Sequence, residues 1–263
     1  MGITERPLPR TRYRIRPSEG GERISSPRVD QILSELLAKD LGPTTLPRLL
    51  CDECATALPV DGVGLALMTE AGPAGLVAAT DERATTMEEL QFNLGEGPCV
   101  DASNLRRPVL HPDLDATAAA RWPAFGPAAL EAGIRAIFAF PLHVGSVRVG
   151  VLDLYRAATG GLSSAELLEA LSFAEAARRL LLHLQDQMPL GDGLHPDLRD
   201  AGPDRSEVHQ ATGMISVQAG VGLAEALMLL RARAFSTGRS ITEVAFDVVN
   251  RTLRFSPEAG DDE

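Results

Sequence analysis

The sequence predicts two domains: an α+β domain built on an antiparallel sheet, and then an all-α bundle of three short helices. Three observations predict this order. Two pairs of strand-like segments, 62–69 with 75–81 and 136–144 with 147–156, are each joined by a short turn. Helical patterns lie before, between and after these pairs, an order typical of an α+β domain. In the last quarter of the chain, the apolar residues recur at helical spacing.

The α+β domain is expected over 27–186. Pro27 opens its first helix, and Ser163 with Glu166 makes a capping box at the start of its last helix. The predicted helices are 27–39, 45–57, 84–91, 122–132 and 164–186. A Gly/Pro-rich turn at 93–102 is expected to enter a further short helix.

The second domain is expected over 204–255. Asp204 with Glu207 marks its start, Ser240 with Glu243 makes a capping box, and glycines separate the helices. The predicted helices are 205–218, 222–238 and 240–255. Each has one apolar stripe for a shared core, formed by Val208, Ala211, Ile215, Leu223, Ala226, Leu227, Leu230, Ala234, Ile241, Val244, Ala245, Val248 and Thr252.

The remaining segments are expected to lack regular structure. Residues 1–26, with six Arg against three Glu, form a disordered basic arm; 187–203 is a linker; and 256–263 is an acidic tail. The net charge is −11, whereas 204–255 has six Arg against five acidic residues. Nucleic-acid modules are usually more basic, because phosphate contacts dominate their affinity. Arginine nevertheless suits RNA loops, since it also stacks on unpaired bases.

Targeting signals are lacking in the sequence. No apolar run approaches the ~20 residues that span a bilayer, and the polar N-terminus has no signal-peptide region. Three cysteines cannot form a full disulfide framework. We therefore expect a cytoplasmic protein with no membrane partner.

Few side chains suggest chemistry of their own. Cys99 is either a redox or ligand contact at a pocket mouth or a small buried side chain. Cys51 and Cys54 form a C-x-x-C without the further ligands that structural zinc needs, so they are expected in the core. The histidines form no catalytic or metal constellation, although a base could stack on His209. No metal, no cofactor and no enzyme activity is expected.

The runs V-H-Q-A-T-G-M-I, A-E-A-L-x-x-L-R-x-x-A and I-T-E-V-A-x-D-V-V resemble an ANTAR domain, the RNA-binding module of bacterial transcription antitermination regulators. The resemblance covers 204–255 and implies binding to terminator or antiterminator RNA hairpins. The residues expected to contact RNA are Gln210, Thr212, Arg231, Arg233 and Arg239. Many family members have Lys where this chain has Thr212, so one cation is missing. Gly213 is expected where two helices approach closely.

GEGPC at 95–99, with Asp101 and Ala102 after it, and FPLHVGSVRVGVLDLYR at 140–156 resemble a GAF domain of the kind that precedes ANTAR modules in actinobacterial proteins. This resemblance covers about 30–186 and implies a sensory pocket and a dimer that pairs through long terminal helices. The pocket is expected to be apolar, with an unknown small ligand or none. Its expected lining is Leu65, Leu67, Val77, Phe92, Cys99, Trp122, Phe125, Phe138, Phe140, Val151 and Leu152.

The predicted function is therefore that of a homodimeric GAF–ANTAR transcription antitermination regulator, which senses a signal and binds structured RNA. An alternative is a protein-interaction or dimerisation module in bacterial signalling that does not bind RNA. A third hypothesis, a catalytic GAF domain of the methionine-sulfoxide-reductase kind with Cys99 as nucleophile, lacks a clear resolving cysteine.

Overall fold

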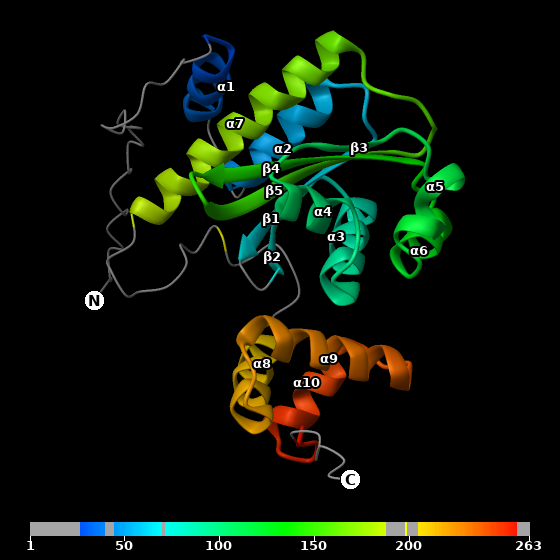
Figure 1. Ribbon diagram of the computed structural model, residues 1–263. Helices are drawn as coiled ribbons and strands as arrows, with labels where there is room; N and C mark the ends of the chain where they lie inside the picture. The colour runs from blue at the N-terminus through cyan, green and yellow to red at the C-terminus, as the bar shows by residue number, and fades with distance from the viewer. Residues whose placement is uncertain (1–26, 40–44, 70–71, 188–197, 199–204, 257–263) are drawn as a thin grey trace, which may run out of the picture.

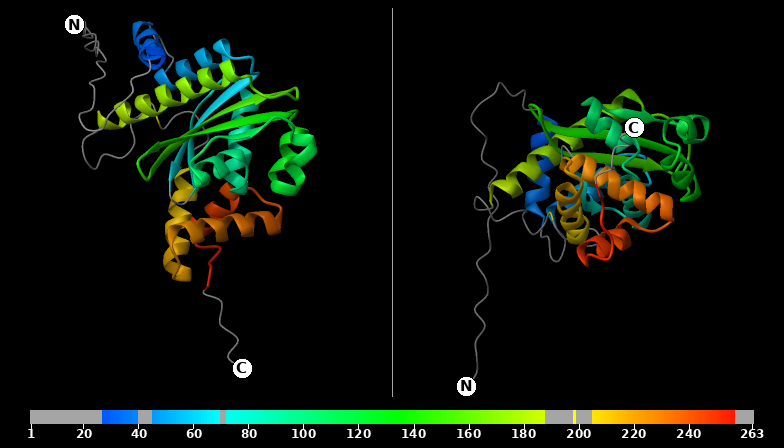
Figure 2. Two further views of the ribbon diagram at one scale, coloured as in Figure 1. Left: turned by 45° about the horizontal axis from the view of Figure 1, so that its top comes forward. Right: turned by 60° about the horizontal axis from the view of Figure 1, so that its bottom comes forward.

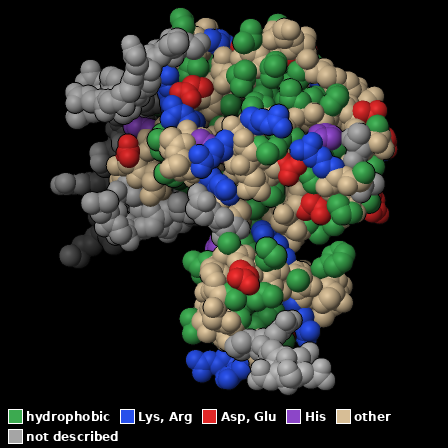
Figure 3. Space-filling model, in the orientation of Figure 1, with side chains coloured by type: hydrophobic (Ala, Val, Ile, Leu, Met, Phe, Trp, Pro, Cys, Tyr) green, Lys and Arg blue, Asp and Glu red, His purple; other side chains and the backbone are tan. Residues whose placement is uncertain are grey.

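A computed structural model describes residues 27–39, 45–69, 72–187, 198 and 205–256. Figure 1 shows two parts: a sheet domain, residues 27–186, and a bundle, residues 206–249, which lies below the sheet domain in this view. Figure 3 shows the bundle as a separate mass that meets the sheet domain over a narrow contact. The order of the two parts along the chain agrees with the prediction.

The sheet has five antiparallel strands in the order β2-β1-β5-β4-β3. Their bounds are β1 Gly62–Thr69, β2 Gly72–Ala79, β3 Val109–His111, β4 Ala136–Val144 and β5 Val147–Arg156. The central strand β5 pairs with β1 and with β4, and its register places Asp153 opposite Gly64. Both predicted strand pairs are confirmed, although β2 begins three residues earlier and ends two residues earlier than the predicted 75–81. The three-residue β3 was not predicted, because so short a strand shows no measurable alternation.

Helices cover both faces of the sheet (Figure 2), and the alternation of side chains along each strand divides the core accordingly. On one face, Leu65, Phe138, Phe140 and Leu152 pack against α2 and α7, and α1 packs on these two helices. On the other face, Ile137, Ala139 and Val151 pack against α3 to α6. The helices are α1 Pro27–Ala38, α2 Leu46–Ala57, α3 Glu82–Leu94, α4 Pro98–Leu105, α5 Leu114–Arg121, α6 Phe125–Glu131 and α7 Ser164–Asp186.

The region between β3 and β4 differs from the prediction. Instead of one helix at 122–132 it contains α5 and α6, which are separated by residues 122–124. A residue before proline is driven away from helical geometry, and Trp122 indeed has φ −133° and ψ 79°. The missed helix α5 is rich in alanine and has no broad apolar stripe, but Asp113 caps it by accepting from the amide of Ala116.

The bundle contains α8 Ser206–Ala219, α9 Leu223–Thr237 and α10 Ile241–Val249. Ser240 and Glu243 form the predicted capping box of α10. Eleven of the thirteen predicted core residues are buried, namely Val208, Ala211, Ile215, Ala226, Leu227, Leu230, Ala234, Ile241, Val244, Ala245 and Val248. Leu223, by contrast, is 58% exposed at the start of α9.

Two expectations for the bundle are wrong. The third helix ends at Val249 and not at 255, because the chain turns at Arg251 with φ 63°, and this leaves Thr252 exposed. Gly213 is not at a close helix contact, since a Cβ built there would meet no atom within 4 Å. The predicted start at Asp204, the arm, most of the linker and most of the tail lie outside the described residues.

Across the residues that the structure describes, no single helix is both long and apolar enough to cross a membrane, although α8 and α9 together, bent by 105°, meet that test of length and composition.

Candidate functional site

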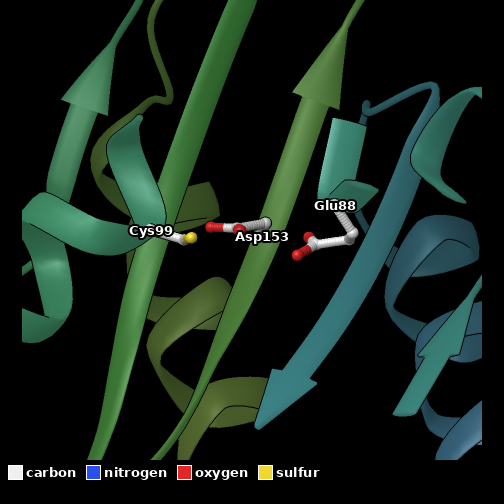
Figure 4. A group of neighbouring side chains, drawn as sticks. All are labelled: Glu88, Cys99 and Asp153. Carbon is white, nitrogen blue, oxygen red and sulfur yellow. The ribbon is translucent and has the colours of Figure 1, made fainter. Parts of the chain in front are cut away.

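A buried polar cluster lies between the sheet and the helices α3 and α4, and Figure 4 shows its three acidic or thiol side chains. Asp153 comes from the middle of β5, Glu88 from α3 and Cys99 from the first turn of α4. Their relative exposures are 0%, 3% and 0%. One ligand-type atom from each residue, a carboxylate oxygen or the sulfur, lies within 4.8 Å of the other two.

Gln91 connects the members of this cluster. Its side-chain Nε2 donates to Asp153 Oδ2 at 2.9 Å, and its Oε1 accepts from the backbone N–H of Cys99 at 2.7 Å. Gln91 and Glu88 are three residues apart, so both lie on the same face of α3. One amide therefore fixes the carboxylate on the strand relative to the start of α4.

Two glycines make room for this arrangement. A Cβ at Gly64 would lie 2.4 Å from Glu88 Oε1, and a Cβ at Gly97 would lie 2.8 Å from Gln91 Oε1. Gly97 has φ 133°, a conformation that side chains rarely adopt, and it is the residue before α4. In the same turn, Glu96 Oε1 accepts from the backbone N–H groups of Ala124 and Phe125, both at 2.9 Å. The GEGPC motif is thus a tight turn that positions Cys99.

Burial controls the electrostatics of the cluster. Desolvation raises the pKa of Asp153 to about 6, and it raises the pKa of Glu88 well above the usual range with a further contribution from the neighbouring Asp153. The pKa of the Cys99 thiol is also raised well above its usual value, by burial first and by the two carboxyl groups second. Burial therefore raises the pKa of all three groups, and each is shifted towards its neutral form.

The bundle docks on the sheet domain at the end of α3. Arg231 of α9 donates from Nε to the carbonyl oxygen of Phe92 at 2.9 Å, and the Arg205 guanidinium carbon lies 3.7 Å from the centre of the Phe92 ring. The last carbonyls of a helix lack partners within it, so a cation at this end is favourable. Phe92 itself is 1% exposed and packs into the core of the bundle.

Gly95 lets Arg231 approach so closely. It ends α3 with φ 63°, and a Cβ at this position would lie 2.8 Å from Arg231 Nη1. Burial lowers the pKa of Arg231 to about 10 and also lowers the pKa of Arg205. The Nη2 atoms of both arginines are buried, with no hydrogen-bond partner among the described residues.

A cavity of about 1010 Å³ lies beside this contact, between the two parts of the molecule. Its walls are largely apolar and come from both parts: Leu90, Leu94 and Val100 from the sheet domain, and Met228, Phe235 and Ile241 from the bundle. Ligand pockets often form at such domain boundaries.

The structure separates the residues that were expected to contact RNA. Gln210, Arg233 and Arg239 are exposed, and Arg239 Nη1 donates to Asp247 Oδ2 at 2.7 Å. Thr212 is 6% exposed, and its hydroxyl donates to the carbonyl of Val208 at 2.7 Å inside the bundle. Arg231 is occupied at the domain contact. The exposed residues of this set therefore number three.

The residues expected to line one apolar pocket do not lie together. Leu65, Phe138 and Phe140 belong to the cluster under α1, α2 and α7, with Leu67, Val77 and Leu152. Cys99 and Trp122 lie on the opposite face, with Phe125 and Val151. Phe92 is in the contact with the bundle. The expectation took apolar residues without separating alternate positions of the strands, which point to opposite faces.

Sequence reasoning missed Glu88, Gln91 and Asp153. A signal for Asp153 is present, because an acidic residue interrupts the apolar run V-G-V-L-D-L-Y of a central strand, where ionisable residues are rarely buried without a role. No comparable signal marks Glu88 or Gln91, since polar residues are ordinary on a short helix.

The other predicted candidates lie in the core of the sheet domain or at the domain contact. Cys51 and Cys54 are free and fully buried in α2, which confirms that they are core residues. His209 is exposed, and its Nε2 lies 3.2 Å from the carbonyl oxygen of Ala74 in β2, so it adds to the domain contact.

The comparison with family models agrees with the fold of the sheet domain. A family model described as GAF domain matches residues 41–181. The GAF domain of an Acinetobacter phosphoenolpyruvate-protein phosphotransferase is 13% identical, with 62% of this chain and 95% of that chain covered and a TM-score of 0.46. The corresponding GAF domain from Coxiella burnetii is 18% identical, with 58% and 90% covered and a TM-score of 0.42.

A free methionine-R-sulfoxide reductase from Neisseria meningitidis, solved with its substrate, is 18% identical, with 61% of this chain and 89% of that chain covered and a TM-score of 0.41. None of the curated proteins matches the chain significantly.

Proposed function

We propose that this chain, which belongs to the GAF domain family, is a signal-responsive RNA-binding regulator of transcription antitermination. In this proposal the bundle is an ANTAR-type module that binds paired RNA hairpins and lets the polymerase read through a terminator. The sheet domain senses the signal and has no catalytic role. The proposal rests on the family-like motifs of the bundle and on the surface that it leaves exposed.

One observation carries the proposal: the arginines of the bundle fall into two groups. Arg205 and Arg231 hold the bundle against Phe92, whereas Arg233 and Arg239 remain exposed, as does Gln210. Exposed guanidinium groups bind phosphate in a bidentate manner and stack on bases, which suits RNA loops. Arg239 also lines the cavity beside the docking contact and donates to Asp247, so a polyanion would compete with that ion pair.

The α3 helix provides a route from the sheet domain to the bundle. It contains Glu88 and Gln91 of the buried cluster, and immediately afterwards Phe92, whose carbonyl accepts from Arg231. A change in the cluster that shifts the end of α3 would alter the docking of the bundle. The domain contact therefore offers a two-state element on which a signal can act.

We further propose that the protein acts as a homodimer paired through α7. On this helix Leu168 is 66% exposed and Leu171 is 41% exposed, three residues apart on one face. Two linked bundles on two linked hairpins would gain affinity through effective concentration. Leu168→Glu should make the protein monomeric in sedimentation measurements, and an unchanged dimer would remove α7 from the proposal.

The test is selection of RNA from the transcript leaders of the source organism, at moderate salt, with the full chain and with a 1–203 truncation. We expect enrichment of paired hairpins by the full chain only. Arg233→Ala with Arg239→Ala should weaken binding and flatten its salt dependence by about one unit of slope per lost phosphate contact. Arg83→Ala with Arg107→Ala, two exposed arginines of the sheet domain, is the control with the same charge change. Unchanged affinity in the first double variant would refute the assignment.

A second function, protein interaction without RNA binding, is favoured by a different observation. The bundle exposes large apolar side chains on α9, with Met228 65% exposed and Phe235 74% exposed. Surfaces of this kind bind protein partners. A partner bound through them would leave any residual RNA affinity independent of Arg233 and Arg239, so the same selection distinguishes the two functions.

A further inference from the structure

We propose that Glu88, Cys99 and Asp153 form a binding site for one divalent transition-metal ion of the zinc type. The three residues come from α3, α4 and β5, and their donor atoms lie within 4.8 Å of one another (Figure 4). Donor atoms at about 2.0 to 2.3 Å from a common tetrahedral zinc ion lie roughly 3.3 to 3.8 Å apart. A pair of donors near the 4.8 Å limit therefore has to approach by about 1 Å when an ion is bound.

The first argument is that Glu88 and Asp153 have no cation to balance their two carboxyl groups. Glu88 Oε1 and Asp153 Oδ1 accept from no other donor among the described residues, although the two side chains are 3% and 0% exposed, and a hydrogen bond between the two carboxyl groups requires one of them to be protonated. A buried carboxylate without compensation is costly, and such groups are normally paired or bound to a metal. Across the described ranges, neither carboxylate has an ion pair with a lysine, arginine or histidine.

The arginines of the bundle do not fill this role. Arg205 and Arg231 are close enough to influence the charges of Glu88 and Cys99, but their described contacts are with Phe92, at the end of α3. They reduce the negative potential of the site from one side.

The donor set indicates the kind of metal. One thiolate with two carboxylates favours zinc or another first-row transition metal, whereas magnesium and calcium prefer oxygen donors alone. Cys99 is the second residue of α4; in the metal-free protein burial and the two carboxyl groups raise the pKa of its thiol, so the thiolate forms only when a cation binds. Three protein donors leave a fourth position of a tetrahedral ion open, which would admit a small ligand in a sensory domain.

Gln91 has the features of a residue that positions metal ligands. It holds Asp153 through Oδ2 at 2.9 Å, which leaves Oδ1 as the free donor atom, and it fixes the backbone of Cys99 at 2.7 Å. Outer contacts of this kind typically change metal affinity by about 10- to 100-fold when they are removed. Gly64 and Gly97 keep the space that Glu88 and Gln91 need.

The competing explanation is a proton shared between the two carboxyl groups. Glu88 in its neutral form could donate to Asp153 and satisfy both oxygens without a metal. The two explanations differ in the role of Cys99, since a shared proton needs no thiol and a metal site does. An experiment that follows the sulfur therefore separates them.

The experiment is a titration of the full-length, reduced and chelator-treated protein with Co²⁺, a coloured substitute for zinc. We expect one equivalent per chain, a thiolate-to-cobalt charge-transfer absorption, and displacement of the cobalt by one equivalent of Zn²⁺. Cys99→Ser should abolish the absorption, and Asp153→Asn should weaken binding at least tenfold. Cys54→Ser, another fully buried cysteine that lies outside the cluster, is the matched control and should bind normally.

Glu88→Gln, which keeps the shape of the side chain, is the second variant if Asp153→Asn does not fold by circular dichroism. It should also weaken binding at least tenfold. Absence of bound cobalt in the folded wild-type protein would overturn the proposal in favour of the shared proton. Bound cobalt whose spectrum and affinity are the same in Cys99→Ser would overturn it as well, because the ion would then lie elsewhere.

Discussion

The sheet domain and the bundle differ in which side chains they bury and which they leave exposed. The sheet domain has two apolar clusters, one on each face of its sheet, and it also buries Glu88, Gln91 and Asp153. The bundle has one small core, which it completes with Phe92 from the sheet domain. On its surface it exposes large apolar side chains, namely Val217, Leu223, Met228, Phe235 and Phe246.

The difference follows from size. A domain of about fifty residues has a high ratio of surface to volume and cannot bury all its apolar side chains. The larger sheet domain has enough packing energy to tolerate a polar cluster in its interior, where function is often located. The bundle depends on a neighbour instead, so docking contributes to its stability as well as to its regulation.

The largest expected effect is in the sheet-domain core. Phe140→Ala removes a ring that is 1% exposed between the sheet and its covering helices, and we expect a loss of about 3–5 kcal/mol in the free energy of unfolding. Urea unfolding followed by the fluorescence of Trp122, the single tryptophan, measures this domain alone. A loss below about 1 kcal/mol would show that this face is loosely packed.

The next effect concerns pH. In the metal-free protein the pKa of Asp153 is about 6 when folded and near 3.8 when unfolded, so the folded state holds the proton more tightly. The contribution of this group to the free energy of unfolding is fully present below about pH 4 and is lost as the pH rises to about 6. Between these values the free energy of unfolding falls by about 1.4 kcal/mol for each pH unit. Glu88 shifts in the same direction.

This pH dependence is measured as urea midpoints at pH 4.5 and 6.5 for the wild-type protein and for Asp153→Asn. We expect the difference between the two pH values to become smaller in the variant, because the amide does not titrate. An equal difference in both proteins would show that Asp153 ionises normally and that the buried cluster is open to water.

A smaller effect is expected at the domain contact. Arg231→Ala removes the hydrogen bond to the Phe92 carbonyl, and charged hydrogen bonds are worth about 1.5–3 kcal/mol. The bundle should undock more often, so that hydrogen exchange at residues 89–95 becomes faster. Arg233→Ala, two residues along the same helix and exposed, should leave this exchange unchanged. Equal effects in both variants would place the docking energy elsewhere.

The smallest effect has the opposite sign. Gly213→Ala should stabilise the bundle by about 1 kcal/mol, because a Cβ at this helical position meets no atom within 4 Å and alanine favours the helix. Slower hydrogen exchange across α8 would confirm this. If the variant keeps its stability but loses RNA binding, Gly213 is part of the contact with RNA.

Much of the fold could be predicted because its signals are local. The β4–β5 hairpin and the helix α7 occupy the predicted residues, and the Ser163 and Ser240 capping boxes form as expected. Each depends on residues within a few positions of one another. The errors occurred where local signals are weak, in the three-residue β3 and the alanine-rich α5, or where a turn ended a helix early at Arg251.

The site was less predictable because its parts are distant in sequence. The sequence alone determined the order of the two parts, the tight GEGPC turn and the burial of Cys51 and Cys54, but it left open whether Cys99 is buried or lies at a pocket mouth. Only the tertiary structure brought Glu88 and Cys99 together with Asp153, because the pairing of β5 with β1 and the packing of α3 decide which residues meet.

The same holds for Arg231, whose position was decided by docking. Its helical spacing and charge are visible in the sequence, but the approach to Phe92 requires the end of α3 and the absent side chain of Gly95. Periodicity shows which face of a helix is apolar, since it depends on neighbours along the chain. It cannot show which partner covers an arginine on the other face, because that depends on surfaces that meet only after both parts have folded.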